Sequence, residues 1–299
     1  MIVITGATGN TGKPATEALL AGGATVRVIG RDGKKLEPFV QKGAEAFVGD
    51  VEDVHAITKA FEGAAAVYLL IPPAQVEDFR AHQERVTDAY AIAVQKAHVP
   101  FVVTLSSMGA QHAEKVGPIA GLHNMEEKLN QISGLNVLHL RPTMFMENLL
   151  MSIPPLRSMG VLPGAAPGDA PLPWIAARDI GTYAAGRLRA RDFIGKSTQE
   201  LIGPREVSMK DVASTIGKAI GKPSLGYMQV PLTMLEPALT QMGMSKKMAA
   251  LMVEMMKAGN DGMLHPQEPR SRKNTTSTTM ESFVADVFGP AYAAKAAGA

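Results

Sequence analysis

The chain begins with MIVITGATGNTG, residues 1–12, and this stretch decides the fold class. Residues 2–5 form a short apolar run that predicts a buried strand. Three glycines spaced three apart follow directly, and residues 13–20 then have helical character. A strand, a glycine turn and a helix in this order make a cradle for phosphate, because the backbone N–H groups at the helix start and the positive end of its dipole face the anion. The sequence therefore predicts a dinucleotide-binding unit.

Each of the three glycines has its own reason to lack a side chain. Gly6 permits the tight turn, Gly9 lets the backbone approach a pyrophosphate, and Gly12 lets the helix lie close to the strand. The spacing GxxGxxG departs from the simplest fingerprint, GxGxxG, so the placement between a strand and a helix carries the prediction. We expect the cofactor phosphates to lie against Gly6, Thr8, Gly9, Asn10, Thr11 and Gly12.

Apolar, β-branched runs alternate with helix-like stretches through the first half of the chain. The predicted strands are residues 2–5, 25–30, 44–49, 65–71, 100–106 and 135–140. The predicted helices between them are residues 14–21, 33–41, 54–61, 75–96 and 122–132. Several strands are apolar on both faces, as expected when helices cover both sides of a sheet. The alternation predicts an α/β fold, a doubly wound parallel Rossmann sheet with ligands beyond the carboxyl ends of its strands.

The character of the chain changes after about residue 151. Residues 153–173, IPPLRSMGVLPGAAPGDAPLP, are rich in proline and glycine and predict a long irregular stretch. Further helices are predicted at 177–189, 208–220 with Ser208 as the N-cap, 234–242, 246–257 and 279–288. We expect a Rossmann domain over residues 1–152, to which the chain returns at about residues 174–194. A smaller, mostly C-terminal α/β substrate or partner domain would take residues 153–299.

The composition excludes several classes of function. The 299 residues carry 30 basic and 28 acidic side chains, and a net charge of +2 gives no field that would favour nucleic acid or an anionic membrane. Cysteine is absent, which excludes disulfides, thiolate nucleophiles and cysteine-based metal sites, and no metal site is predicted. No apolar run is long enough to span a bilayer, and a first strand at residue 2 leaves no room for a targeting peptide. We expect a cytoplasmic protein.

Arg31, in the stretch VRVIGRDGKK, stands just past the second predicted strand, where dinucleotide-binding folds distinguish their two cofactors. A carboxylate at this place hydrogen-bonds the ribose, whereas an arginine accommodates a 2′-phosphate. Lys35 adds positive charge close behind. Asp32 could still reach a ribose, and Arg31 could also be a plain surface charge. We predict NADP(H), with NAD(H) as the less favoured cofactor.

The ends of the later strands supply further predicted contacts with the cofactor. Asp50 and Val51 follow the third strand, where the carboxylate can reach the adenine edge or simply cap the next helix. Ile71 and Pro72 end the fourth strand and would run beneath the ribose and pyrophosphate. Ser106 ends the fifth strand, close to the expected place of the nicotinamide.

A methionine stripe stands out in the C-terminal part, with Met244, Met248, Met252 and Met255 on one face of a predicted helix. The stripe is either core or subunit contact, or else an adaptable wall for a flat apolar substrate, since methionine repacks readily around varied shapes. It is also a candidate surface for a homodimer or another protein partner.

Several motifs resemble those of a known family. TGATGNTG at residues 5–12, SSMGA at 106–110, GLHNMEEKL at 121–129 and GLNVLHLRPTMFMENL at 134–149 are similar to the NmrA-like, atypical branch of the short-chain dehydrogenase/reductases. The resemblance covers about the first 150 residues well and the rest more loosely. It implies an NADP-binding Rossmann domain with a smaller substrate domain. Members of this family resemble quinone and dye reductases, relatives of isoflavone-type reductases, and non-catalytic redox-sensing regulators.

Standard members of the wider superfamily carry YxxxK, in which the tyrosine gives a proton and the lysine binds the nicotinamide ribose. Counting back from Gly134 places the lysine position at His123 and the tyrosine position at Ile119, so the tyrosine acid is absent. His123 is the catalytic candidate, as a hydrogen-bond partner of the ribose or as a proton donor, with Glu127 four residues later to orient it. The alternative is a histidine with only a structural role.

These observations favour an NADPH-dependent reductase that passes hydride to a flat conjugated acceptor such as a quinone. Such acceptors need little from the protein beyond placement against the nicotinamide. Phe145, Asn148 and Trp174 would line the acceptor pocket. The alternative is a non-catalytic regulator of the NmrA type that senses NADP(H) and binds a protein partner without turnover.

Overall fold

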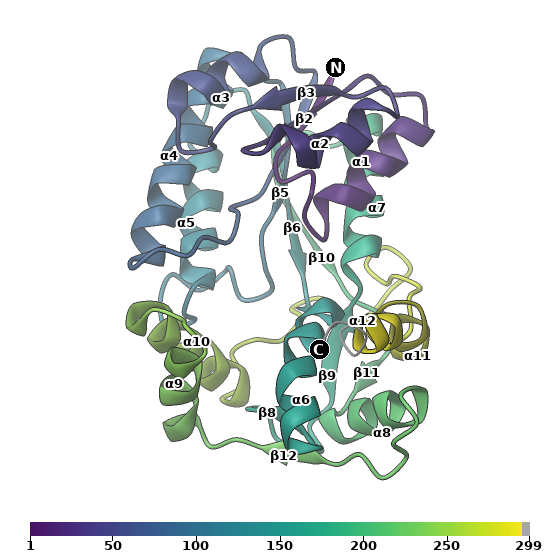
Figure 1. The fold of residues 1–299 in the computed structure, drawn as a ribbon. Coiled ribbons are helices and arrows are strands. Elements are labelled where there is room, and N and C mark those ends of the chain that lie inside the picture. Colours follow the sequence, from purple (N-terminus) through teal and green to yellow (C-terminus); the bar gives the residue numbers. More distant parts are fainter. Residues whose placement is uncertain (295–299) are drawn as a thin grey trace. The chain divides into compact units, whose positions relative to one another are not determined.

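The structure is a computed structural model in which residues 1–294 are described (Figure 1). The chain divides into two compact units. The first unit comprises Met1–Glu114, Pro118–Arg141 and Arg178–Gln199, and the second comprises Lys115–Gly117, Pro142–Ala177 and the chain from Glu200 onward. The domain limits expected from the sequence stay a prediction.

A seven-stranded sheet forms the centre of the first unit, in the order β10-β6-β5-β4-β1-β2-β3. Its strands are β1 (Ile2–Ile4), β2 (Val26–Gly30), β3 (Glu45–Val48), β4 (Ala66–Leu69), β5 (Phe101–Leu105), β6 (Asn136–Pro142) and β10 (Lys196–Leu201). The first six strands pair in parallel, which confirms the predicted Rossmann-like α/β sheet. The sequence did not predict β10, because the first four residues of this edge strand, KSTQEL, are polar and alternate between exposed and half-buried in place of an apolar run.

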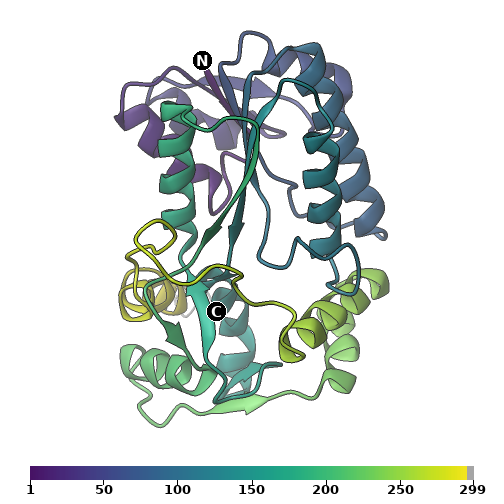
Figure 2. The ribbon, with the colours of Figure 1, turned by 180° about the vertical axis from the view of Figure 1, so that it is seen from behind.

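The helices of the first unit lie on both faces of this sheet. They are α1 (Gly12–Ala21), α2 (Gly33–Val40), α3 (Val54–Phe61), α4 (Phe79–Lys96), α5 (Ile119–Asn130) and α7 (Ala177–Ala190). Two opposite views show α3, α4 and α5 on one face and α1 and α7 on the other (Figure 1, Figure 2). A Cβ on Gly181 of α7 would lie 2.3 Å from the Thr11 carbonyl oxygen, so α7 packs directly against the start of α1.

A row of four valines runs across the middle of the sheet. Val3, Val67, Val102 and Val137 come from β1, β4, β5 and β6, lie opposite one another in register, and are 0% exposed. Burying each such side chain contributes about 1.5–3 kcal/mol. The row anchors the four strands, so that the loops after them start from a rigid base.

The second unit has two small sheets, in the orders β11-β9-β7 and β12-β8. The strands are β7 (Met144–Phe145), β8 (Leu162–Gly164), β9 (Leu172–Ile175), β11 (Glu206–Val207) and β12 (Tyr227–Gln229). The helices are a 3-10 helix (Met146–Ser152), α6 (Ile153–Met159), α8 (Met209–Ala219), α9 (Leu232–Gln241), α10 (Lys246–Asn260), α11 (Met280–Phe283), a π-helix (Val284–Phe288) and α12 (Gly289–Ala294). Ser208 caps α8 as predicted, because its Oγ accepts from the Asp211 N–H at 3.2 Å.

The prediction that residues 153–173 form one long irregular stretch is wrong. This segment contains α6, β8 and the first residues of β9. Pro154 and Pro155 lie in the first turn of α6, where the missing N–H has no helical partner to lose. Pro163 lies in β8, which among residues 1–294 pairs with β12 alone and can therefore spare a donor on its other edge.

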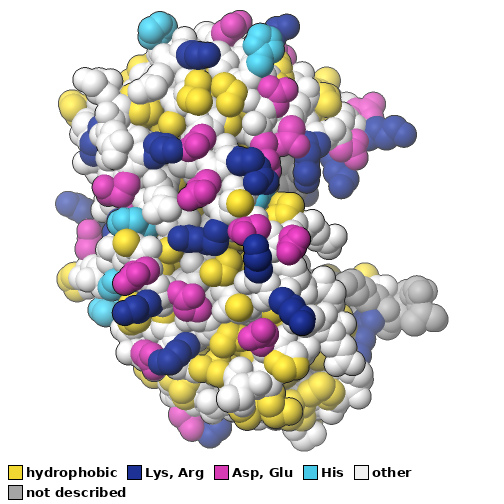
Figure 3. Space-filling view, turned by 90° about the vertical axis from the view of Figure 1, so that its left-hand side faces the viewer, with side chains coloured by type: hydrophobic (Ala, Val, Ile, Leu, Met, Phe, Trp, Pro, Cys, Tyr) yellow, Lys and Arg dark blue, Asp and Glu magenta, His cyan; other side chains and the backbone are white. Residues whose placement is uncertain are grey.

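The surface shows no broad patch of a single charge sign on the face drawn in Figure 3, where basic and acidic side chains are interspersed. Within residues 1–294, no helix has the length and apolarity needed to cross a membrane. In the same described part, no group of three or more His, Asp or Glu residues could hold a metal ion.

Candidate functional site

The predicted cofactor residues of the first unit lie after the carboxyl ends of five neighbouring strands. The sheet order places β1 beside β4, and the chain runs outward from this point in both directions. Such a reversal of strand order opens a crevice at the carboxyl ends, where open α/β sheets bind ligands. The sheet thus brings together the segments that begin at Gly6, Arg31, Asp50, Ile71 and Ser106.

The glycine turn after β1 has no room for side chains at two positions. Gly6 has φ +61°, a conformation that favours glycine, and a Cβ there would lie 2.7 Å from Leu70. A Cβ on Gly12 would lie 2.1 Å from the Gly6 carbonyl oxygen. Gly9 closes the turn by donating its N–H to that oxygen at 2.9 Å, and its own Cβ position is less crowded. The turn therefore brings the backbone close to whatever lies above it.

The start of α1 is open to an anion. No side chain caps this helix, although its N-cap residue is Thr11. The Thr11 hydroxyl instead accepts a hydrogen bond from the Tyr68 hydroxyl at 3.1 Å, on the buried side. Thr8, Gly9 and Asn10 are exposed. The backbone N–H groups at the helix start, together with its dipole, are therefore suited to phosphate.

A buried polar network holds this turn in place. Thr5 Oγ1 donates to the Tyr68 carbonyl oxygen at 2.9 Å and accepts from the Leu70 N–H at 3.1 Å, which ties the ends of β1 and β4 together. The Tyr90 hydroxyl of α4 donates to the Leu70 carbonyl oxygen at 2.8 Å. Burial raises the pKa of both Tyr68 and Tyr90, so both phenols stay protonated and keep donating.

The segment after β2 presents the predicted phosphate-binding charges. Arg31 and Lys35 are both exposed. Asp32 is the N-cap of α2 and accepts from the Lys34 N–H at 3.0 Å, so its carboxylate has a structural task. The role of Arg31 in selecting between the two dinucleotides stays a prediction.

Asp50 and Val51 lie in the loop between β3 and α3. Asp50 is exposed and accepts from the Glu52 N–H at 3.0 Å, which closes a short turn. The alternative in which Asp50 caps the next helix is wrong, because Asp53 is the N-cap of α3 and accepts from two N–H groups of its first turn.

Ser106 belongs to a buried charged cluster at the end of β5. Its hydroxyl donates to Glu126 Oε1 of α5 at 2.5 Å. Arg141, at the end of β6, grips the same carboxylate with Nε at 3.0 Å and Nη2 at 2.5 Å. Glu126 is 3% exposed, so this bidentate pair is held away from water and fixes the Ser106 hydroxyl as an acceptor for other groups. Arg141 stood in a recognised motif, but nothing in the sequence paired it with Glu126.

His123 lies half-buried on α5 and makes one hydrogen bond that the structure describes. Its Nδ1 lies 2.9 Å from the Ala110 carbonyl oxygen, which can only accept, so Nδ1 carries the proton. Ile119, at the tyrosine position, is the first residue of α5 and 6% exposed. Glu127 lines a groove between α4 and α5. The catalytic role of His123 stays a prediction.

The three predicted acceptor residues belong to the second unit. Phe145 is half-buried in β7, and Asn148 is exposed in the 3-10 helix. Trp174 of β9 is 2% exposed, packs in the core of that unit, and donates its indole N–H to the Val207 carbonyl oxygen at 2.9 Å. The indole therefore has a role in the core of its unit, and contact with an acceptor stays a prediction for all three.

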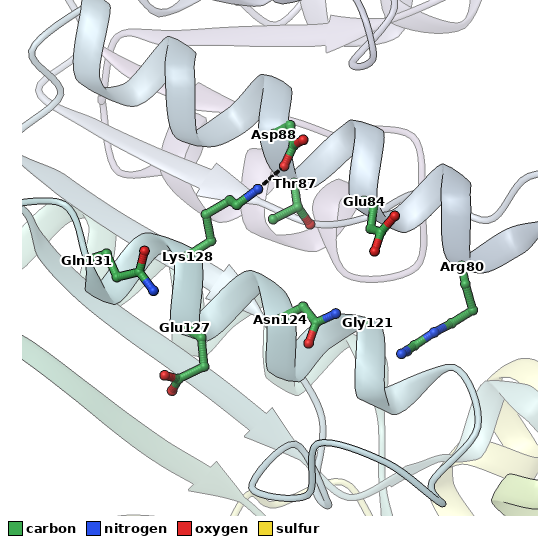
Figure 4. Close-up of a pocket in the computed structure, with 9 residues that line it drawn as sticks. All are labelled: Arg80, Glu84, Thr87, Asp88, Gly121, Asn124, Glu127, Lys128 and Gln131. Atoms are coloured by element: carbon green, nitrogen blue, oxygen red, sulfur yellow. Dashed lines mark hydrogen bonds and ion pairs between the residues drawn. The ribbon is translucent and has the colours of Figure 1, made fainter.

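A polar groove of about 400 Å³ lies between α4 and α5 (Figure 4). It contains none of the predicted cofactor residues. Lys128 of α5 forms an ion pair with Asp88 of α4 beside it. Thr87 is 3% exposed and its hydroxyl has no hydrogen-bond partner among the described residues.

Sequence reasoning missed three residues of the strand-end region: Glu52, His82 and Arg85. Glu52 directly follows the predicted adenine contacts Asp50 and Val51, and its position in the chain was a usable signal. His82 and Arg85 lie on α4, 30 or more residues further on, and only the fold brings them to Glu52.

Comparison with known proteins places the chain in a family. The sequence model of the NmrA-like family matches residues 1–284. The NAD(P)H azoreductase of Xenophilus azovorans is 28% identical over 257 residues, which span 85% of this chain and 86% of that protein. Quinone oxidoreductase 2 of Escherichia coli strain K12 is 26% identical over 292 residues, or 96% of this chain and 99% of that one.

A solved structure agrees with this assignment. The crystal structure of an NADPH-dependent quinone oxidoreductase from Escherichia coli, complexed with NADPH, has a TM-score of 0.78 and 25% identity, and the match covers 96% of this chain and 100% of that chain. The family match spans nearly the whole sequence, and the resemblance of the sequence motifs is confirmed. The protein belongs to the NmrA-like family.

Proposed function

We propose that the first unit binds NADP(H) along the carboxyl ends of β1 to β5. The observation that carries this proposal is the glycine turn at the uncapped start of α1, where a side chain on Gly12 would collide with the backbone. The exposed Arg31 would take the 2′-phosphate, and Asp50 and Ser106 would lie toward the adenine and nicotinamide ends. The related structure, which was solved with NADPH, supports the same cofactor.

The proposed reaction is hydride transfer from NADPH to a flat conjugated acceptor such as a quinone. An NAD(P)H azoreductase and a quinone oxidoreductase among the relatives support an oxidoreductase of this type. The cofactor supplies the hydride when bound. The role of Phe145, Asn148 and Trp174 as acceptor contacts stays a prediction from the sequence.

The proton that completes the reduction has two proposed sources. Ile119 has none to give, since it replaces the superfamily tyrosine. In a neutral His123 ring, Nδ1 already donates to Ala110, and Nε2 is left as an acceptor. His123 therefore donates only as an imidazolium, and water supplies the proton otherwise. An acceptor that tolerates protonation by water fits this site better than an alcohol or a sugar substrate does.

The test is an absorbance assay of NADPH oxidation with the purified protein and a panel of quinones and azo dyes. We expect oxidation well above the uncatalysed rate for at least one acceptor. The loss-of-function variant for this assay is Gly12→Ala, in which the added methyl group would close the cradle and turnover should fall to the uncatalysed rate.

Tight NADPH binding with no turnover across the panel would contradict the reductase proposal and favour the sensing alternative.

Two further expectations from the sequence stay predictions. One is a cytoplasmic location. The other is the binding of a second copy or another protein through the methionine-rich face at α10. In the structure Met244, Met248, Met252 and Met255 are half-buried, and α10 packs against α9.

A further inference from the structure

His82 connects two loops that the proposed NADP(H) site uses. It lies on α4, 3% exposed, with its ring tilted against the Phe79 ring at 5.6 Å between centroids. Its Nδ1 lies 2.5 Å from Glu52 Oε1 in the loop after β3, and its Nε2 lies 2.9 Å from the Pro72 carbonyl oxygen in the loop after β4. One buried side chain therefore reaches both the proposed adenine loop and the proposed ribose loop.

The hydrogen bonds determine the charge of this ring. The Pro72 carbonyl oxygen can only accept, so Nε2 must carry a proton. Arg85 binds the other oxygen of Glu52, with Nε at 2.5 Å, and this hydrogen bond, helped by His82, holds the pKa of the Glu52 carboxyl below its ordinary value. An ionised Glu52 can only accept as well, so Nδ1 also carries a proton. The contacts are those of an imidazolium.

Among residues 1–294, the hydrogen bonds of the ring go to Glu52 and Pro72. On the α4 side, Asp78 caps the helix and Arg85 pairs with Glu52, while Arg80, Glu84 and Asp88 line the groove with α5. The titratable side chains of the facing loop and of α3 are exposed to water: Asp50, Asp53, His55 and Lys59. Those of α5 have partners elsewhere or line the groove with α4: His123, Glu126, Glu127 and Lys128.

The ring matters because the loop after β4 has little structure of its own. Residues 70–76 form neither helix nor strand. Within them, Ile71 and Pro72 are the proposed floor under the ribose and pyrophosphate. A neutral ring has one proton for two acceptors, so loss of the charge releases either Pro72 or Glu52.

We propose that His82 is a positioning residue of the dinucleotide site, which as an imidazolium ties the adenine loop to the ribose loop and lets go of one of them when it loses its proton. The inference rests on the proposed binding of NADP(H). Its consequence is that cofactor affinity depends on the protonation of a side chain that does not touch the cofactor.

The test compares the NADPH dissociation constants of the wild type and His82→Gln by calorimetry from pH 6 to pH 9. Glutamine keeps one contact at every pH, so we expect the variant to bind about tenfold more weakly at pH 6 and about equally at pH 9. Taking the ratio at each pH cancels the titration of the cofactor's own phosphates. His55→Gln, which removes an exposed histidine of α3, is the matched control and should leave the ratio at one throughout.

A ratio that does not change with pH would overturn the proposal. Nitrogen-15 NMR of the histidine rings gives a second, independent readout: at pH 6 both ring nitrogens of His82 should carry protons, and a neutral ring would equally overturn it. If His82→Gln does not fold, Glu52→Gln serves instead, because Glu52 is partly exposed. Without the Glu52 carboxylate to stabilise its charge, the His82 ring should lose its proton at a lower pH. The pH at which NADPH affinity falls should therefore decrease, and an unchanged pH profile would overturn the proposal.

The outcome also separates this inference from the proposed function. Absence of NADPH binding by the wild type at every pH would defeat the proposed cofactor site itself. Binding that is tight and insensitive to the His82 substitution would leave the cofactor site standing and defeat only the role of His82.

Discussion

We propose that Arg31 decides between the two cofactors in this site. It is exposed after β2, and the neighbouring carboxylate of Asp32 is engaged as the cap of α2. A guanidinium on a phosphate makes charge-assisted hydrogen bonds worth about 1.5–3 kcal/mol. The side chain therefore has its largest effect on the cofactor that carries a 2′-phosphate.

We expect Arg31→Ala to weaken NADPH binding by about 10- to 100-fold and to leave NADH binding nearly unchanged. Calorimetric titration of both cofactors measures the two constants. Lys218→Ala, which removes an exposed charge of α8, should change neither. An equal loss for NADPH and NADH would show that Arg31 acts on the fold or on a shared part of the cofactor.

At this scale, single residues were predictable where backbone chemistry selects them. Gly6 and Gly12 stand where a Cβ cannot fit, and glycine is then the only choice. The partners of Ser106 and of Pro72 were not predictable, because Glu126 and His82 reach them from other elements. Side-chain pairing over such distances depends on the three-dimensional fold, which a pattern of residue types does not record.

Among the elements, the turn from β1 into α1 has the least freedom to change. We expect Gly12→Ala to lower the free energy of unfolding by about 3 kcal/mol and to abolish NADPH binding, because the new methyl group would displace the Gly6 carbonyl. Chemical denaturation and calorimetry measure the two effects.

Gly186→Ala is the matched control for this change. Gly186 lies in α7 with nothing within 4 Å of its Cβ position. The same substitution there should raise stability by about 0.5–1 kcal/mol, because alanine is the better helix former, and should leave binding intact. A similar response of both variants would mean that the close contact at Gly12 does not govern the cradle.

Helices and strands were predictable where their residues follow a clear pattern of polar and apolar side chains. The prediction of residues 54–61 as a helix matches α3 residue for residue, because an apolar face recurs at helical spacing between Asp53 and Gly63. In contrast, the two prolines of α6 concealed a helix, since proline signals a break everywhere except in a first turn.

At the scale of the whole molecule, the buried side chain of His139 makes the free energy of unfolding depend on pH. Burial lowers the pKa of His139 to about 4 from its ordinary value near 6.5. The ring bridges Thr104 Oγ1 at 2.8 Å and Asn130 Oδ1 at 3.1 Å. The unfolded chain binds the proton first as pH falls. The stabilising contribution is therefore complete above about pH 6.5 and is lost between there and about pH 4.

We expect the free energy of unfolding of the wild type to fall by about 3 kcal/mol more than that of His139→Gln between pH 7 and pH 4. Denaturant titrations at several pH values measure the difference between the two proteins, in which the contributions of the titrating groups that they share cancel. His55→Gln, which removes an exposed histidine, should follow the wild type. Parallel decline of the wild type and His139→Gln would refute this source of acid sensitivity.

The edge strand β10 is synthesised well after β6, the strand that it covers. Val137 donates its N–H to the Gly195 carbonyl oxygen at 2.8 Å, and Asn136 Oδ1 accepts from the Gly195 N–H at 2.9 Å, so the outer side of β6 is covered by residues made some 60 positions later. A nascent chain that has emerged from the ribosome only as far as β6 carries an unpaired strand edge, which invites association with other chains. The edge is closed only once residues 196–201 have emerged and paired with β6, so a product truncated before them would keep an edge open to aggregation.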